Sequence, residues 1–455
     1  MQDLHTLQDL HTMAPELVPV PQASDGPSSG AAAAAVPAAF LMDLMLRHFS
    51  RPGELKLYEV SRRLGMGPLD VEPLLAHMRS LQMLEVPRRG SYEGDVSYDL
   101  TEYGQRHAQM AFDKCQYVGP APVTLDEYVV QVQQQSQGPA PVTAGALKQA
   151  LADMVMDEAM LPALGSALNS GKAIYLYGDS GTGKTYLAEH LVKTLHGHIW
   201  VPHAIYVDGE VVQVFDPMVH RRVAVAAANE RGLARDLASD GRWVRCERPV
   251  VMAGGELTLQ TLELEYDRHT RLHVAPPQMK ANNGIFVVDD LGRQRVSPGE
   301  LMNRWIVPLD RHVDYLSLNT GGKFAVPFDA RVVFSSNLPP DEMVDPAFAR
   351  RLGYKIHMAP LDAGGYRTVI GQACASAGVE PDARSIDFLV DALHPRHGQP
   401  FLPCIPHDVI SKIADRARYL DQPPRMTPEL VEWAWHLYFW VGEKNLQADS
   451  ATQLK

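Results

Sequence analysis

The chain has 455 residues, of which 45% are hydrophobic, so it is long enough for two or three globular domains with buried cores. Its formal net charge of −12 argues against a protein that coats nucleic acid over its whole surface. The four cysteines form no C-x-x-C pair and no stretch approaches the roughly 18 apolar residues of a membrane helix, which predicts a cytoplasmic protein without disulfides, a cysteine zinc site or a membrane segment.

Residues 1–36 are predicted to be a disordered tail. The segment Gln2–Thr6 is repeated as Gln8–Thr12, and proline, serine, glycine and a run of alanines follow, none of which can build a core. A short docking peptide in the repeated segment is the alternative that we keep. The last residues, 446–455, are also predicted to be a tail.

Residues 37–116 are predicted to form a separate small α+β domain. Three amphipathic helical stripes end near Phe49, Leu64 and Leu81, two short strands follow, and Thr101 opens a closing helix. Three helices followed by a hairpin resemble a winged helix-turn-helix domain. A linker rich in proline, glycine and glutamine is predicted over 117–142.

The charge of the small domain leaves its partner open between DNA and protein. Its cations and anions nearly balance, whereas DNA-binding domains concentrate positive charge on the docking face. The third helix begins with Asp70 and Glu72, where such domains carry base-reading residues. Arg88 and Arg89, in the loop between the two strands, are placed to contact phosphates. We keep both partners and prefer protein.

A glycine-rich loop fits the pattern G-x-x-x-x-G-K-[ST] and lies between a short apolar strand and a helix. Backbone N–H groups of such a loop surround phosphates, and the start of the helix adds its positive end. Lys184 is predicted to reach the β- and γ-phosphates, and the Thr185 hydroxyl to bind Mg²⁺. The predicted ATP-binding residues of the loop are Gly178, Asp179, Ser180, Gly181, Thr182, Gly183, Lys184 and Thr185.

A second apolar strand, residues 284–288, ends in the carboxylates Asp289 and Asp290. Side chains at the carboxyl end of such a strand point toward the phosphate site of an open α/β sheet. Asp289 is predicted to bind Mg²⁺ through its water shell, and Asp290 to polarise the attacking water. The alternative is a pair of acids that cap a turn.

The remaining segments follow in an order that resembles the AAA+ ATPases. They are a hairpin pattern over 313–328, a strand 331–336 that ends at Asn337, a segment 345–352 with two arginines, and several helices within 359–445. The resemblance implies a phosphate-loop α/β domain over 143–358, a parallel sheet flanked by helices, followed by a helical lid over 359–445. The hairpin resembles that of the MoxR, magnesium-chelatase and enhancer-binding-activator branches, where such insertions contact the remodelled partner.

The resemblance also implies roles for further residues. Asn337 is expected to orient the attacking water, as the asparagine of this strand does in the family. Arg350 or Arg351 is expected to act as an arginine finger on the nucleotide of a neighbouring subunit. His407 stands where the family carries a lid arginine that contacts the nucleotide, and this departure puts the coupling of the lid to the γ-phosphate in doubt.

The leading interpretation is an ATPase that forms a homo-oligomeric ring, expected to be a hexamer, and remodels a protein recruited by the winged-helix-like domain. The first alternative is a DNA-binding regulator gated by nucleotide. The second is a scaffold that binds ATP without turnover, because His407 and the second aspartate, Asp290, both depart from the residues common in the family.

Overall fold

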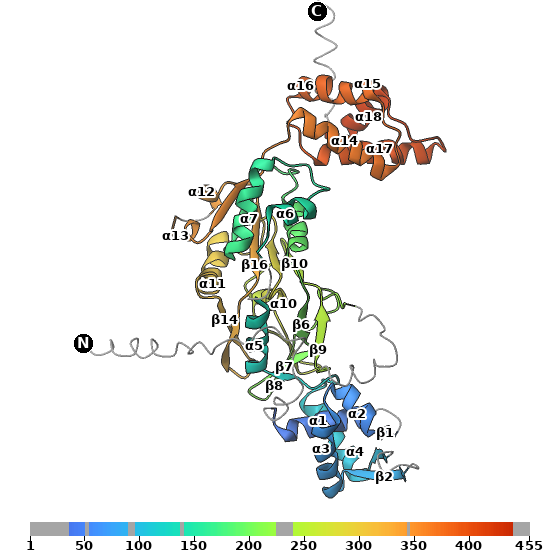
Figure 1. The fold of residues 1–455 in the computed structure, drawn as a ribbon, viewed down its shortest axis with the longest axis vertical. Helices are drawn as coiled ribbons and strands as arrows, with labels where there is room; N and C mark the ends of the chain where they lie inside the picture. The colour runs from blue at the N-terminus through green and yellow to red at the C-terminus, as the bar shows by residue number, and fades with distance from the viewer. Residues whose placement is uncertain are drawn as a thin grey trace, which may run out of the picture.

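The computed structural model describes residues 36–50, 54–89, 96–136, 141–223, 240–343 and 346–439. Along its long axis, the N-terminal unit lies at one end, a β-rich layer and a parallel sheet follow, and a C-terminal helical unit lies at the other end (Figure 1). In the part of the chain that is described, no helix has both the length and the apolar character needed to cross a membrane. Apart from residue 36, the predicted tails, 1–36 and 446–455, fall outside these ranges.

The centre of the molecule is a five-stranded parallel sheet in the order β10-β13-β16-β5-β17. Its strands are β5 (Ile174–Tyr177), β10 (Val250–Ala253), β13 (Ile285–Val288), β16 (Arg331–Ser336) and β17 (Tyr354–His357). The first, third and fourth of these were predicted as strands, and each buries an apolar run, as expected for a sheet covered on both faces.

Helices cover both faces of this sheet. On one face, Trp305 of α11 (Pro298–Arg311) stacks on Phe286 with ring centroids 5.1 Å apart. On the other face, Leu164 and Leu187 are buried in one cluster with the sheet. They belong to α7 (Leu161–Ser170) and α8 (Lys184–His190), and α6 (Ala144–Ala150), capped by Thr143, adds to the same cluster. The predicted α/β fold class, with a parallel sheet flanked by helices, is confirmed.

The N-terminal unit contains the predicted helices and strands. They are α1 (Ala38–Phe49), β1 (Leu55–Lys56), α2 (Leu57–Leu64), α3 (Pro68–Ser80), β2 (Leu84–Arg89), β3 (Val96–Leu100) and α4 (Glu102–Lys114). The strands form an antiparallel sheet in the order β1-β3-β2. The Thr101 hydroxyl caps α4 by accepting from Gly104 N at 2.9 Å.

The segment 117–142 is not a simple linker. It contains β4 (Val123–Thr124) and α5 (Leu125–Ser136), which bury Val123, Tyr128 and Val132. The proline, glycine and glutamine of this segment led to the linker prediction, although Leu125, Tyr128, Val129 and Val132 recur at helical spacing. Residues 115–122 and 141–143 belong to no helix or strand.

A β-rich layer, whose core includes Val123, Tyr128 and Val132, lies between the N-terminal unit and the parallel sheet. Its larger sheet has the order β11-β12-β8-β7-β4, and β6 pairs with β9. The strands are β6 (Ile199–Pro202), β7 (Ala204–Val207), β8 (Glu210–Gln213), β9 (Trp243–Cys246), β11 (Glu265–Asp267) and β12 (Leu272–Val274), and the short helix α10 (Pro277–Lys280) follows.

The N-terminal unit packs directly on this layer. Phe40 and Tyr206 have ring centroids 4.8 Å apart, and Ala121 N donates to Leu64 O at 2.8 Å. Gly65, with φ +67°, approaches Gly241 so closely that a Cβ added to it would lie 2.4 Å from the Gly241 carbonyl carbon. A side chain at either glycine would separate the two parts of the molecule.

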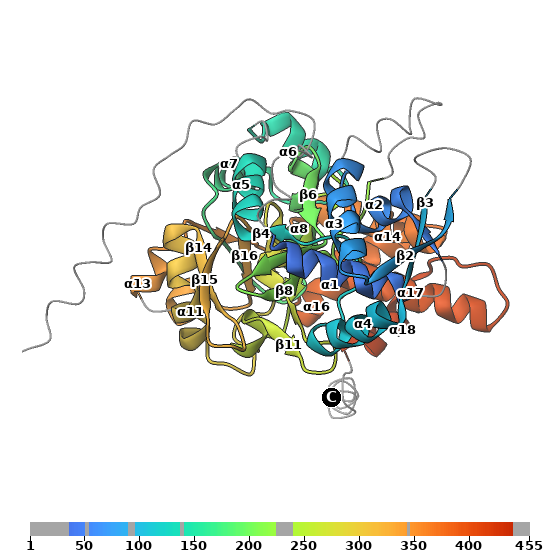
Figure 2. The same ribbon diagram turned by 90° about the horizontal axis from the view of Figure 1, so that it is seen from below.

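The predicted hairpin before the Asn337 strand is confirmed. β14 (Val313–Ser317) pairs antiparallel with β15 (Lys323–Pro327). One face of the hairpin is buried in the β-rich layer through Leu316, Phe324 and Val326. Seen from below, the hairpin lies to the left beside α11, and the N-terminal unit lies to the right (Figure 2).

The C-terminal unit is helical. Its helices are α14 (Ala363–Ala377), α15 (Ala383–Asp387), α16 (His394–His397), α17 (Cys404–Tyr419) and α18 (Pro428–Phe439). The sequence predicts Trp433, Leu437 and Trp440 as the core stripe of the last helix. Val431, Ala434 and Trp435 are the fully buried residues, Trp433 is half-buried, Leu437 is 55% exposed, and Trp440 falls outside the described ranges. The buried face is set by packing against His394, whose ring lies 4.8 Å from that of Trp435.

Candidate phosphate-binding site

The glycine-rich loop connects the end of β5 to the start of α8. Gly178, Gly181 and Gly183 have φ values of +143°, +88° and +91°, a region that favours glycine. A Cβ on Gly178 would lie 2.3 Å from the Met358 carbonyl oxygen. The glycines of the motif are therefore needed for the backbone path itself, which turns sharply beside β17.

Lys184 extends from the first residue of α8 back across the loop. Its Nζ donates to Gly178 O and Asp179 O at 2.8 Å and to Asn337 Oδ1 at 2.9 Å. The side chain is buried, and this burial lowers the pKa of Lys184, while the nearby carboxylates of Asp290, Asp289 and Asp179 act to raise it. A buried cation held among carbonyl oxygens at a glycine-rich loop is suited to a phosphate group.

Thr185 and Asp289 face each other across the sheet edge. The Thr185 hydroxyl lies 3.0 Å from Asp289 Oδ1 and 2.9 Å from Asp289 Oδ2. Among the described residues, no group of three or more His, Cys, Asp or Glu side chains is placed to hold a metal. One hydroxyl and one carboxylate fit Mg²⁺, which completes its ligands with phosphate oxygens and water.

The strand order explains why these side chains meet. β16 lies between β13, which ends at the aspartates, and β5, which ends at the loop. Asn337 follows β16 and so lies between them, in contact with Lys184. Asp290 is not glycine but has φ +49°, a left-handed conformation that aspartate tolerates. Lys184, Thr185, Asp289 and Asn337 were all named from the sequence as site residues, and the parallel sheet places them at one edge.

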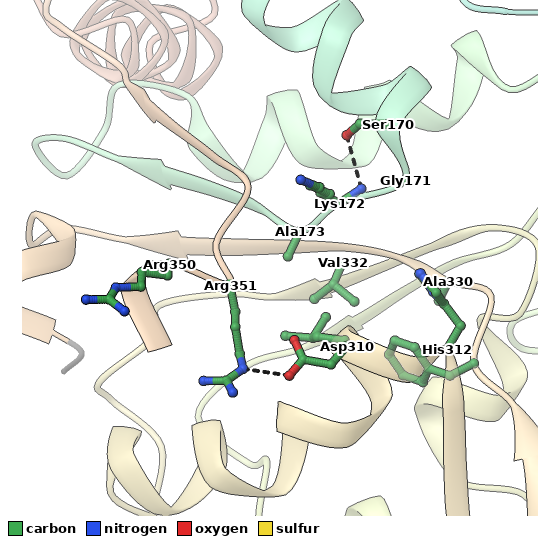
Figure 3. Close-up of a pocket in the computed structure, with 12 residues that line it drawn as sticks. Ser170, Gly171, Lys172, Ala173, Asp310, His312, Ala330, Val332, Arg350 and Arg351 are labelled. Carbon is green, nitrogen blue, oxygen red and sulfur yellow. Dashed lines mark hydrogen bonds and ion pairs between the residues drawn. The ribbon is translucent and has the colours of Figure 1, made fainter. Parts of the chain in front are cut away.

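Arg350 and Arg351 lie at the opposite edge of the sheet. They precede β17, whose Tyr354 pairs with Ile174 at the start of β5, whereas the phosphate loop follows the end of β5. With Lys172, they line a pocket of about 570 Å³ (Figure 3). Arg350 is exposed, and Arg351 Nε donates to Asp310 Oδ2 at 2.8 Å. The structure therefore does not bring either arginine to the phosphate loop of its own chain.

His407 is exposed on the first turn of α17. The residue of this helix that contacts the phosphate loop is Cys404, whose N–H donates to Gly181 O at 3.3 Å. A Cβ on Gly181 would lie 2.3 Å from Cys404 Sγ. Sequence reasoning missed Cys404, because no local pattern indicates a contact between segments so distant along the chain.

The fold and the site together define a phosphate-loop α/β protein with a helical unit packed against the loop. A family described as a domain of unknown function, DUF8689, matches residues 362–437, which make up most of that helical unit. No curated protein sequence matches the chain.

The chain also has distant likenesses to solved structures. NtrX from Brucella abortus is similar with a TM-score of 0.39 and 13% identity, over 62% of this chain and 57% of that chain. NtrX from the same organism in complex with ATP has a TM-score of 0.37 and 14% identity, over 72% and 61%. A RuvB mutant from Thermotoga maritima has a TM-score of 0.35 and 10% identity, over 69% and 72%. This chain thus spans less than two thirds of either NtrX chain, and similarities this distant do not assign a function to it.

Proposed function

We propose that this chain is an AAA+ ATPase that binds ATP with Mg²⁺ and hydrolyses it. The observation that carries the proposal is the convergence of Lys184, Thr185, Asp289 and Asn337 at one edge of the parallel sheet, with Lys184 Nζ 2.9 Å from Asn337 Oδ1 and Thr185 Oγ1 2.9 Å from Asp289 Oδ2. A phosphate-loop lysine, a metal-binding hydroxyl and a strand-end carboxylate are the parts that phosphoryl transfer requires.

Each residue has a role that follows from its chemistry. Lys184 supplies positive charge to the β- and γ-phosphates, and Thr185 and Asp289 hold Mg²⁺, which neutralises charge on the same phosphates. Asp290 follows the metal-binding aspartate and accepts a proton from the attacking water. Asn337, a neutral amide beside Lys184, orients that water.

The helical unit, residues 359–445, is proposed to be the lid of this site. Cys404 N donates to Gly181 O at 3.3 Å, and Gln372 Nε2 donates to Asp153 O at 3.3 Å, so α17 contacts the loop and α14 contacts the segment between α6 and α7. His407, which we predicted as a nucleotide contact, keeps that assignment only if the lid rotates on ATP binding, because its side chain is exposed.

The ATPase is proposed to work as a ring in which each site is shared between neighbours. Arg350 and Arg351 lie at the sheet edge opposite to the phosphate loop, which suits a residue that acts on the next subunit. An arginine supplied by a neighbour stabilises negative charge in the transition state of phosphoryl transfer. A closed ring satisfies every such site.

The N-terminal unit is proposed to recruit a protein partner through the winged-helix-like face of α3. The exposed face of this helix carries Leu69, 85% exposed, and Pro73, with one acid, Glu72, and one base, Arg79. A partly apolar face without an excess of positive charge suits protein better than the phosphate backbone of DNA. Salt-dependent binding of duplex DNA by the full chain would contradict this part of the proposal.

Two variants test the ATPase proposal together. Lys184→Ala removes the phosphate-binding cation and is expected to abolish tight ATP binding, measured by fluorescent-nucleotide titration. Asp290→Asn leaves the loop intact and is expected to bind ATP as the wild type does but to lower kcat by roughly 100-fold or more, the size of a lost general base. ATP binding that survives in Lys184→Ala, or unchanged turnover in Asp290→Asn, contradicts the assigned roles.

A further inference from the structure

The segment Gly292–Gln294 follows the catalytic aspartates and is not explained by the ATPase roles assigned above. Gln294 is half-buried between the end of β13 and the start of α11. Its Nε2 lies 2.9 Å from Asp289 O, 3.3 Å from Asp290 O and 3.4 Å from Gly254 O at the end of β10. Its Oε1 accepts from Gly292 N at 2.8 Å. One side-chain amide thus binds four backbone groups around Asp290.

The backbone of Asp290 adopts a conformation that aspartate tolerates but that few non-glycine residues adopt, and the contacts of Gln294 hold it there. Its φ of +49° is left-handed, and Gly292, at +102°, continues the turn, which Arg293 N closes by donating to Asp290 O at 2.9 Å. A non-glycine residue in this region is held there by its surroundings. This conformation sets where the Cβ of Asp290 points and so limits the directions open to its carboxylate.

We propose that Gln294 is a positioning residue that holds the left-handed turn at Asp290 and so directs its carboxylate toward the attacking water. The inference rests on the proposed ATPase function and adds a residue to it. Gln294 acts through the backbone carbonyls of Asp289 and Asp290. Its hydrogen bonds within the described residues do not involve Lys184, Thr185 or the Asp289 carboxylate, so we expect it to act on the chemical step and not on the binding of ATP.

For this role the side-chain amide of Gln294 must donate hydrogen bonds, so variants that cannot donate them test the proposal. In Gln294→Glu the size and the acceptor are kept, but a carboxylate cannot donate to the carbonyls of Asp289 and Asp290. Gln294→Met keeps the length of the side chain and removes both polar atoms. We expect each variant to lower kcat for ATP by roughly 10- to 100-fold, the cost of a misplaced catalytic group, while the Kd for ATP stays within twofold of the wild type.

The matched control is Gln109→Glu on α4, where an exposed glutamine far from the sheet donates to Asp113 at 3.4 Å. It undergoes the same chemical change and is expected to leave kcat unchanged. Steady-state ATPase rates and nucleotide titrations on the full chain measure both quantities, and an unchanged Kd also reports that the site has folded.

The outcomes distinguish failure of the proposed ATPase function from failure of the positioning role of Gln294. If the wild type does not hydrolyse ATP, the proposed function fails, and the role of Gln294 fails with it. If the wild type hydrolyses ATP and Gln294→Glu keeps its kcat, only the positioning role is wrong. If Kd weakens as much as kcat falls in both variants, Gln294 supports the loop as a whole and the positioning role is overturned.

Discussion

At the scale of single residues, the phosphate loop is constrained from outside its own motif. Gly178 is confined by Met358 at the end of β17, and Gly181 by Cys404 of the helical unit. The pattern of the loop is local, but the two residues that confine it lie far along the chain. The sequence therefore predicts which residues are glycine and leaves open what surrounds them.

Gly181→Ala is expected to weaken ATP binding by at least about tenfold. The new Cβ would stand 2.3 Å from Cys404 Sγ, and the backbone there has φ +88°, so the loop or α17 must shift. Adding Cys404→Ala, which removes Sγ, is expected to recover part of the loss. Nucleotide titration measures both.

The control for this prediction is Gly371→Ala on α14, where a Cβ meets nothing within 4 Å. It is expected to leave ATP binding unchanged, because alanine is the better helix former and no neighbour is displaced. Equal affinities for ATP in Gly181→Ala and the wild type would show that the contact between loop and α17 is dispensable.

Residues with a local signature were predicted, and residues that act across the fold were not. Lys184, Thr185 and Asp289 belong to patterns that couple residue type to spacing, and the structure brings them together. Gln294 and Cys404 carry no such pattern. Their importance depends on which strand or loop lies opposite, and only the folded chain determines that.

At the scale of elements, one half-buried arginine, Arg304, joins α11 to the hairpin. Arg304 NH1 lies 2.7 Å from Asp314 Oδ1 of β14, and Arg304 Nε lies 3.0 Å from Glu263 Oε1. Asp314 is 3% exposed and also accepts from Gln278 Nε2 at 3.1 Å. The ion pair therefore ties the hairpin to the helix that begins just after Gln294.

Arg304→Met is expected to destabilise the protein by about 3 kcal/mol, because it leaves the Asp314 carboxylate buried without its cation. Combining it with Asp314→Asn is expected to recover most of that loss, since a neutral amide needs no counter-charge. Urea unfolding of the full chain measures both. Arg418→Met, which breaks an exposed ion pair with Asp415, is the control and should change the free energy of unfolding little.

Elements with a strong internal pattern were predicted and weakly patterned ones were not. The strands β5, β13 and β16 are short apolar runs, and the hairpin β14–β15 alternates buried and exposed residues. Helix α5 has an apolar stripe of only two turns beside a run of glutamines, and it packs on β15 and the β-rich layer. In α18 the buried residues Val431, Ala434 and Trp435 recur at helical spacing, but the sequence offered more than one such stripe, and packing against His394 shows which one is buried.

At the scale of the whole molecule, the two ends of the proposed catalytic machinery lie at opposite edges of one sheet. The phosphate loop contacts the helical unit, and Arg350 and Arg351 line a pocket on the other side, near the hairpin end of α11. The N-terminal unit lies at the far end of the long axis (Figure 1). A single chain therefore holds both halves of the proposed shared site without joining them.

Mixing two inactive variants tests this arrangement. Lys184→Ala lacks a working phosphate loop but keeps its arginines, while the double variant Arg350→Ala, Arg351→Ala keeps the loop. If sites are shared, each variant alone is inactive and the mixture regains ATPase activity, because loops of the second meet arginines of the first. The ATPase rate of the mixture should rise more steeply than linearly with total protein concentration.

The controls for mixing are each variant at the total concentration of the mixture. Light scattering must also show that the two variants assemble together. Variants that assemble together and regain no activity would contradict an arginine supplied by a neighbouring chain.

The sequence by itself determined the phosphate loop, the aspartates after β13 and the α/β class, because each rests on residues close together along the chain. The tertiary structure alone decided that 117–142 is built into a β-rich layer, that Cys404 faces the loop, that Gln294 binds the carbonyls around Asp290 and that both arginines lie at the opposite end of the sheet from the phosphate loop. These are contacts between segments far apart in the chain, and they depend on the register and packing of the sheets, which no local pattern encodes.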